Sequence, residues 1–235
     1  MSWLARQLDA SFRTPVERDH RQSDRAFRWR RTVALVTLAV GATLLSISLS
    51  IEPGDPRFYP LTLALAATWT VGALLSGPLH VGRIQGRSRL GRPVLQPIAV
   101  GVVAVGVFAV GGLLVAQVPP LEHSVNSVLD HARQGSLPLI VLITTVNGVA
   151  EELFFRGGLY AAIGVRHPVP ISTAVYTLAT VATGNVMLVF AAAVLGVLVG
   201  LQRRASGGVL APILTHVTWS LGMLLVLPPI MGAVL

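Results

Sequence analysis

The chain has 235 residues, of which 53% are hydrophobic and only 12% are charged, and its mean hydropathy is +0.70. This composition is too apolar for a soluble domain of this length and predicts one all-α membrane domain. The net charge of +8 comes from basic residues that are all arginine. Because the arginines flank apolar runs and do not form one basic face, a nucleic-acid-binding protein is excluded. The absence of cysteine excludes disulfides and thiolate chemistry.

Residues 1–31 form an arginine-rich segment that ends in VERDHRQSDRAFRWRR. We expect a cytoplasmic, interfacial segment that also contacts anionic lipid. The apolar run that follows is about twice as long as the apolar part of a signal peptide and continues into further spans. It is therefore interpreted as an anchor and not as a cleaved signal.

Apolar runs of roughly 20 residues predict a polytopic transmembrane helical bundle of about seven spans. The expected spans are 32–51, 60–77, 95–118, 137–163, 169–183, 186–202 and 208–227. Only Gly184 and Asn185 separate the fifth span from the sixth, so these two form either a tight helical hairpin or one broken helix. After the N-terminal segment we expect N-terminal transmembrane helices over 32–118 and a core of transmembrane helices over 137–227.

The arginines predict the orientation through the positive-inside rule. With the N-terminus in the cytoplasm, only Arg57 and Arg133 lie outside, and Arg156 lies within a span. The other arginines are cytoplasmic: Arg6, Arg13, Arg18, Arg21, Arg25, Arg28, Arg30, Arg31, Arg83, Arg87, Arg89, Arg92, Arg166, Arg203 and Arg204. The chain is thus expected to be a multi-pass protein of a bacterial inner membrane, the bacterial origin being suggested by the all-arginine, Ala-, Val- and Gly-rich composition.

The fourth expected span carries three ionisable residues in NGVAEELFFRGG, namely Glu151, Glu152 and Arg156. Each such group costs about 2.5–3.5 kcal/mol in a span, so those that are present are functional candidates. Glu152 and Arg156 stand one helical turn apart and are expected to pair. Glu151 points about 100° away, towards the face that carries Asn147, and is a surplus carboxylate. The alternative is that all three form a buried packing network.

Two later spans add polar groups at a similar depth. In LAPILTHVTWS, His216 and Ser220 lie on one face of the seventh span, and Thr180 lies in the fifth. At a rise of about 1.5 Å per residue from the cytoplasmic ends, Glu151 is roughly 18 Å deep, Thr180 roughly 16 Å and His216 roughly 10 to 15 Å. Three helices are therefore predicted to offer polar groups to one plane.

In order and spacing, these motifs resemble the CPBP (CAAX protease and bacteriocin-processing) family, the Abi-like membrane proteins that include the type II CAAX prenyl endopeptidases. EELFFR is similar to the family's EExxxR motif, FxxxH aligns with Tyr176 to Thr180, and HxxxN aligns with His216 to Ser220. The resemblance covers residues from about 137 to 227. The family's second histidine is thus Thr180 here, and its asparagine is Ser220.

The resemblance implies an intramembrane endopeptidase in which a glutamate activates water. Glu151 would be the general base, Glu152 and Arg156 would support it, and His216 would help to stabilise the oxyanion. Zinc is a candidate cofactor, but Glu151 and His216 supply two ligands where a catalytic zinc normally has three.

Our hypothesis is a protein that hydrolyses membrane-anchored peptides near the cytoplasmic face, from a cavity bounded by spans four to seven. The alternative is a catalytically silent protein of the same fold that binds a peptide, a lipid or a partner helix. A transporter ranks third because no inverted repeat is present. The expected partners are membrane lipids and a membrane-anchored peptide or protein substrate. No role is assigned to the pair Gly196 and Gly200 beyond helix packing, nor to the remaining histidines: His20, His80, His123, His131 and His167.

Overall fold

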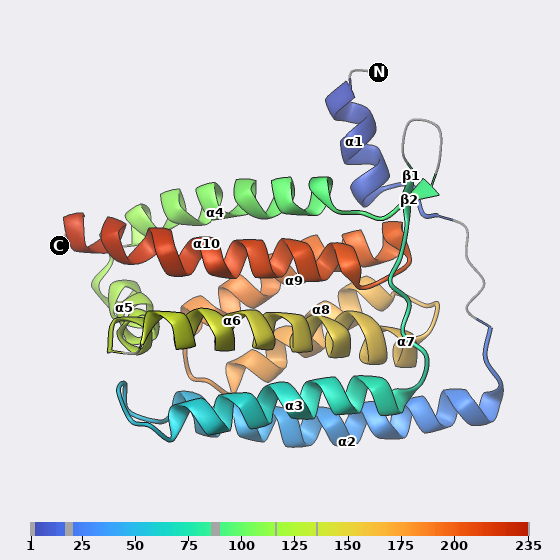
Figure 1. Ribbon diagram of the computed structural model, residues 1–235, viewed down its shortest axis with the longest axis horizontal. Helices are drawn as coiled ribbons and strands as arrows, with labels where there is room; N and C mark the ends of the chain where they lie inside the picture. The colour runs from blue at the N-terminus through green and yellow to red at the C-terminus, as the bar shows by residue number, and fades with distance from the viewer. Residues whose placement is uncertain (1–2, 17–20, 86–89, 116, 135, 235) are drawn as a thin grey trace.

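The computed structural model is a bundle of nearly parallel and antiparallel helices (Figure 1), and it describes residues 3–16, 21–85, 90–115, 117–134 and 136–234. Four residues named in the sequence analysis lie outside the described residues: Arg18, Arg87 and Arg89, which were expected in the cytoplasm, and His20. The elements are α1 Trp3–Phe12, α2 Asp24–Leu49, α3 Phe58–Ser76, β1 Ile84–Gln85, β2 Leu90–Gly91, α4 Leu95–Val115, α5 Pro119–Gln134, α6 Leu137–Glu152, η1 Leu153–Leu159, α7 Tyr160–Ile163, α8 Pro168–Val181, α9 Val186–Ser206 and α10 Leu210–Val234. Strands β1 and β2 pair over two residues each, and the described fold is otherwise all-α.

Within the described parts of the chain, six helices are long and apolar enough to cross a membrane: α2, α3, α4, the continuous run α6–η1–α7, α9 and α10. The expected all-α bundle of about seven spans is thus confirmed as six long apolar helices and one shorter apolar helix, α8. Helix α8 has 14 residues, which gives about 21 Å against a hydrocarbon core of about 30 Å. It is short because the chain turns after Val181, where Gly184 adopts φ +70°.

Helices α8 and α9 form the tight hairpin and not one broken helix. Gly196 of α9 lies against Thr173 of α8, and one turn later Gly200 lies against Val169. As the residue number rises in one helix it falls in the other, so the two are antiparallel. The absence of side chains at the two glycines allows this close approach, which agrees with the packing role expected for the pair.

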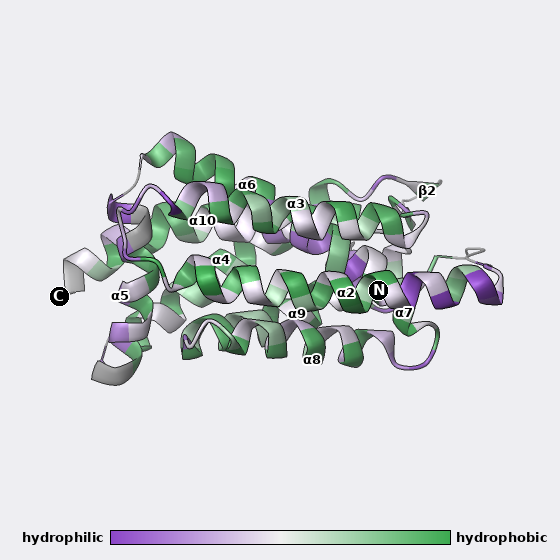
Figure 2. Cartoon of the chain, turned by 90° about the horizontal axis from the view of Figure 1, so that it is seen from below, coloured by the Kyte–Doolittle hydropathy of each residue, from purple (hydrophilic) through white to green (hydrophobic). Residues whose placement is uncertain are grey.

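The helices alternate in direction, so most of the arginines meet at one end of the bundle. This arginine-rich end, at the right of Figure 1, gathers the starts of α2, α4, α8 and α10 with the ends of α3, α7 and α9. Figure 2 shows hydrophilic residues towards the two ends and a hydrophobic band between them. The band is exposed to the outside, as in α4, where Val103 and Val107 are 66% and 64% exposed. A bilayer is the solvent that such a surface requires.

Helix α2 begins at Asp24, eight residues before the span that the sequence predicted, because the charged stretch continues the helix beyond its apolar part. The hydroxyl of Ser23 caps it by accepting a hydrogen bond from the backbone N–H of Ala26. The arginine-rich segment is thus partly an extension of the first membrane helix.

Helix α5 was not predicted, and it lies at the end opposite the arginine-rich end (Figure 1). Val125 and Leu129, one turn apart, are buried against Met231 of α10. The side-chain amide of Asn185 donates to the Ser124 carbonyl at 2.7 Å and to the Ser127 hydroxyl at 3.0 Å. The side-chain oxygen Oδ1 of Asn185 also caps the start of α9 by accepting from the backbone N–H groups of Met187 and Leu188. This residue therefore joins α5 to the α8–α9 turn.

Candidate active site

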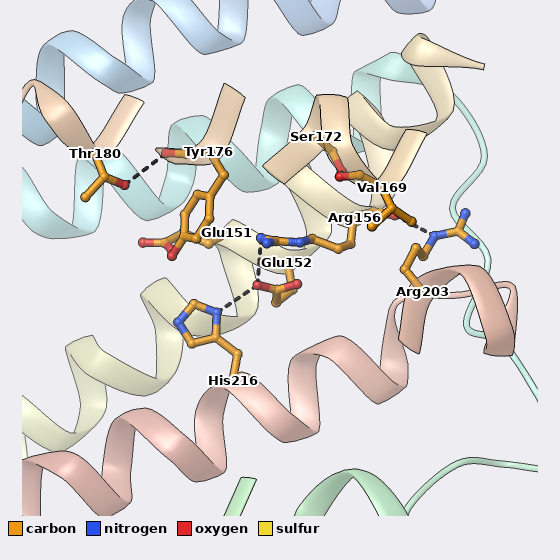
Figure 3. A network of polar contacts seen from close by, with 9 residues as sticks. All are labelled: Glu151, Glu152, Arg156, Val169, Ser172, Tyr176, Thr180, Arg203 and His216. Carbon is orange, nitrogen blue, oxygen red and sulfur yellow. Dashed lines mark hydrogen bonds and ion pairs between the residues drawn. The ribbon is translucent and has the colours of Figure 1, made fainter. Parts of the chain in front are cut away.

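Glu152 and Arg156 form the ion pair that their spacing predicts. Arg156 donates from Nη1 to Oε1 of Glu152 at 3.0 Å, and neither side chain is exposed (Figure 3). The pairing offsets most of the cost of placing either charge in a low-dielectric interior. Glu152 is therefore occupied as a structural partner.

His216 of α10 forms a hydrogen bond with Glu152. Its Nδ1 lies 2.8 Å from the same Oε1 that Arg156 contacts. An ionised carboxylate only accepts hydrogen bonds, so Nδ1 carries a proton in this pair. The second ring nitrogen, Nε2, is on the opposite side of the ring from Glu152 and is the group that His216 can offer to a ligand.

Glu151 is held by a residue that the sequence reasoning missed. The hydroxyl of Tyr176 donates to Oε2 of Glu151 at 2.7 Å. Among the described residues this is the one side chain that hydrogen-bonds Glu151. The ring of Tyr176 also lies under the guanidinium of Arg156, 4.6 Å from its centre, so one tyrosine contacts both the surplus carboxylate and the buried pair. The available signal was the tyrosine at the phenylalanine position of FxxxH.

Thr180 and Ser220 lie in the same cavity as Glu151 and His216. The hydroxyl of Thr180 donates to the Tyr176 carbonyl of its own helix at 2.9 Å, so its proton is already engaged. Ser220 lies one turn after His216 on α10 and lines the cavity as well. Glu151, Thr180, His216 and Ser220 thus line one cavity, whereas Glu152 and Arg156 are fully buried and are not among the residues that line it.

Asn147 is a second residue of the site for which the sequence analysis predicted no role. It lies one turn before Glu151, and its amide nitrogen donates to the Ile143 carbonyl at 2.9 Å. Its side-chain oxygen is buried and has no partner within the described structure. Asn147 lines the cavity beside Glu151, so this oxygen is an acceptor for a water molecule or an N–H group of a ligand.

The cavity has a volume of about 730 Å³ and is lined by more helices than the sequence predicted. Residues of α2, α3, α4 and α5 line it together with those of the four predicted spans, so the expected boundary of spans four to seven is corrected. Its wall is mostly apolar, with aromatic residues such as Phe108, Phe190 and Trp219. From Glu151 it extends back along most of α6 to Val125 and Leu129 of α5, away from the arginine-rich end.

The backbone beyond Glu152 is a π-helix, η1, which the sequence did not predict. Phe154 of η1 stacks on Trp69 of α3 with ring centres 4.7 Å apart, and the tilted ring of Phe155 contacts the same tryptophan at 5.1 Å. Gly158 packs against Ser76 and Ala73 of α3, where a side chain would not fit without displacement. These contacts fix the end of α6, and π-turns within helices frequently accompany functional sites.

The titratable groups do not fit a catalytic zinc. Among the described residues, no three His, Cys, Asp or Glu side chains are grouped so that they could hold a metal ion. Of the two ligands considered, His216 directs Nδ1 to Glu152, and Glu151 accepts from Tyr176.

The comparisons with known proteins concern the part of the chain that carries these residues. No curated protein and no solved structure matches the chain. One family does match, over residues 133–222, and this stretch contains every residue of the candidate site from Asn147 to Ser220. Residues 133–222 therefore form a domain of the family described as type II CAAX prenyl endopeptidase Rce1-like.

Proposed function

We propose that this protein is an intramembrane endopeptidase that hydrolyses membrane-anchored peptides, with Glu151 as the general base. The observation that carries the proposal is the difference between the two adjacent glutamates. Glu152 is fully buried between Arg156 and His216, whereas Glu151 lines the cavity and is partly exposed to it. A carboxylate placed in a membrane cavity without a cationic partner of its own is poorly explained by packing.

The hydrogen bond from Tyr176 fixes the carboxylate of Glu151 for this role. With Oε2 held at 2.7 Å from the phenol, Oε1 is the oxygen that takes a proton from a water molecule. That water attacks the carbonyl carbon of the scissile peptide, and its electron pair forms the new C–O bond. Because the base is positioned before the substrate arrives, little reorganisation is needed in the reaction.

His216 is proposed to act on the carbonyl oxygen through Nε2. Glu152 accepts from Nδ1 at 2.8 Å and so orients the ring and stabilises its protonated form. The protonated ring donates from Nε2 to the oxygen that becomes negative during attack. When the C–N bond breaks, the proton taken up by Glu151 passes to the leaving amine, and a carboxylic acid and an amine are the products.

The cavity supports cleavage within the bilayer. Glu151 lies near the middle of the continuous helix Leu137–Ile163, about 18 Å from its end at a rise of 1.5 Å per residue. The cavity continues from there towards α5, which the charge rule places opposite the cytoplasm. We therefore place hydrolysis at the depth of Glu151, deeper than the cytoplasmic face first expected, on an extended segment of an anchored substrate.

The test is hydrolysis of a membrane-proteome peptide library by the purified full-length protein. We compare wild type with Glu151→Gln, which keeps the size of the side chain but removes the base. Glu52→Gln is the matched control, since Glu52 is an exposed carboxylate in the loop between α2 and α3. The proposal expects peptides that are cut by wild type and by Glu52→Gln but not by Glu151→Gln.

The second candidate is a catalytically silent protein that binds a peptide, a lipid or a partner helix in the same cavity. It is favoured by Thr180 and Ser220, which replace the histidine and asparagine of the family pattern, and by the engaged hydroxyl of Thr180. This candidate expects peptides to be bound in the cavity but not cut. A folded wild type that cuts nothing in the library, and binds peptides as well as Glu151→Gln does, would favour it over the endopeptidase.

A further inference from the structure

A second cavity, of about 480 Å³, lies at the arginine-rich end and is separate from the candidate active site. Its polar lining comes from Gln22, Arg30, His80, His167, Arg203 and Arg204, and no Asp or Glu is among its described lining residues. We call it the basic pocket. It lies between the start of α2, the loop after α3, the loop before α8 and the end of α9.

Arg30 is the cation that is set deepest in this pocket. It is only 5% exposed, and its guanidinium donates to Gln22 Oε1 at 3.2 Å, to the Pro78 carbonyl at 3.3 Å and to the Ser76 hydroxyl at 3.5 Å. All three of these acceptors are neutral. A buried guanidinium is costly unless an opposite charge is near, so an anion in the pocket would stabilise the folded protein.

Arg203 and Arg204 bring two more positive charges to the same cavity. The Nε of Arg203 donates to the Arg156 carbonyl at 2.6 Å, and its guanidinium lies over the ring of Tyr160, 4.9 Å from the centre. These contacts hold Arg203 in place at the pocket wall. Arg204 is exposed, so it can approach a ligand without a change in the packing of α9.

The surroundings of the basic pocket are those of a membrane interface. Trp29 is exposed and donates from its indole N–H to the Leu75 carbonyl at 3.0 Å, at the level of Ser76, as interfacial tryptophans do. Pro170 belongs to the pocket lining, and from it an exposed apolar stripe runs along α8 through Ile171 and Leu178. A ligand with an anionic head and hydrocarbon chains would match both surfaces.

We propose that the basic pocket binds the phosphate group of an anionic phospholipid, whose acyl chains lie along the outer face of α8. Basic pockets between transmembrane helices are suited to anionic headgroups, because the arginines meet the phosphate where water is scarce. The site is independent of the proposed peptidase chemistry. It shares with it only Arg156, whose carbonyl accepts from Arg203.

The experiment titrates the purified, delipidated full chain with phosphatidylglycerol and measures the bound fraction by native mass spectrometry. Phosphatidylcholine and inorganic phosphate are titrated in parallel. The proposal expects one tightly retained phosphatidylglycerol, at least tenfold weaker retention of phosphatidylcholine, and no retention of inorganic phosphate at the same concentration. Equal effects of inorganic phosphate and of the lipid would overturn the lipid assignment.

Variants locate the site. Arg204→Gln removes an exposed charge and is expected to weaken phosphatidylglycerol binding by about tenfold or more, the effect of one charge-assisted hydrogen bond. Arg30→Gln is expected to do the same if it folds. Arg166→Gln is the matched control, because Arg166 is an exposed arginine of the same end that does not line the pocket, and its affinity should stay within twofold of wild type. An equal loss in Arg204→Gln and Arg166→Gln would show diffuse attraction to a basic surface and would overturn the pocket.

Discussion

The adjacent residues Glu151 and Glu152 belong to one helical turn but have different partners. Glu152 accepts from Arg156 and His216 at a single oxygen and has no exposed surface. Glu151 accepts from Tyr176 and lines the larger cavity. Because the two carboxylates differ in their partners and in their burial, substitutions at the two positions should have different consequences.

Glu152→Ala is expected to destabilise the protein strongly, because it leaves Arg156 without its carboxylate and His216 without its acceptor. Breaking a buried pair on one side costs about 3–5 kcal/mol. Glu151→Gln keeps an acceptor for Tyr176 and should stay within about 1 kcal/mol of wild type. Thermal unfolding of the purified variants in detergent measures both. Equal destabilisation would mean that Glu151 belongs to the same packing network.

Tyr176→Phe tests whether the phenol positions Glu151. The change deletes the hydrogen bond of 2.7 Å but keeps the ring beneath Arg156. We expect kcat for peptide hydrolysis to fall about 10- to 100-fold with KM little changed, since the loss falls on the orientation of the base. Tyr59→Phe, on α3 and outside the cavity lining, is the control. A rise in KM with kcat unchanged would assign Tyr176 to substrate binding instead.

At the scale of single residues, the sequence predicted what lies within one helix and missed what lies between helices. The pair Glu152 and Arg156 follows from helical spacing alone. The contacts His216 to Glu152 and Tyr176 to Glu151 join residues 64 and 25 positions apart. Depth along each helix placed these residues in one plane, but it carries no information on rotation about the helix axis, which decides the partners.

At the scale of elements, apolar length predicted the six long helices and also the short helix α8, which ends at Val181 where the sequence predicted an end at residue 183. The sequence predicted that helix α8 continues beyond Val181 because small, weakly polar residues follow it. In the structure the helix ends at Val181, just before the turn at Gly184. Helix α5 carries the amphipathic spacing of Leu121, Val125 and Val128, a signal that the apolar-run criterion passes over. The π-turns of η1 have no such signal in the sequence; in the structure they carry Phe154, which stacks on Trp69 of α3.

The close α8–α9 contact predicts that valine in place of Gly196 lowers the stability more than valine in place of Gly106, a glycine of α4 outside this contact. Gly196→Val would place atoms against Thr173 and the Arg156 guanidinium, whereas the position of Gly106 on α4 has open space around it. We expect Gly196→Val to lower stability by about 1–3 kcal/mol, the usual cost of overpacking, and Gly106→Val to cost under 1 kcal/mol. Melting temperatures in the same detergent compare the two. A similar loss in both would show that the hairpin is not closely packed in solution.

At the scale of the whole molecule, helix direction and charge give one orientation. The described cytoplasmic candidates, from Arg30 at the start of α2 to Arg204 at the end of α9, share one end of the bundle, while Arg57 and Arg133 lie at the other. The family domain of residues 133–222 then spans the whole thickness of the bundle. The side of the membrane on which each end lies is a prediction of the positive-inside rule.

Reporter fusions test this orientation. A reporter that requires the cytoplasm should be active when inserted after Arg204 and inactive when fused at Leu235, because α10 crosses the membrane between these points. A fusion in the loop at Glu52 should be inactive as well. Activity at Leu235 together with inactivity after Arg204 would reverse the orientation.

The central claim is that Glu151 activates water for peptide hydrolysis inside the bundle. The most direct measurement is mass spectrometry of the products formed in H₂¹⁸O by the reconstituted full-length protein. Wild type should place one ¹⁸O atom from solvent in the new C-terminal carboxylate of each cleaved peptide, and folded Glu151→Gln should yield no labelled product. Cleavage and labelling by Glu151→Gln at the wild-type rate, or a folded wild type that labels no peptide, would contradict the claim.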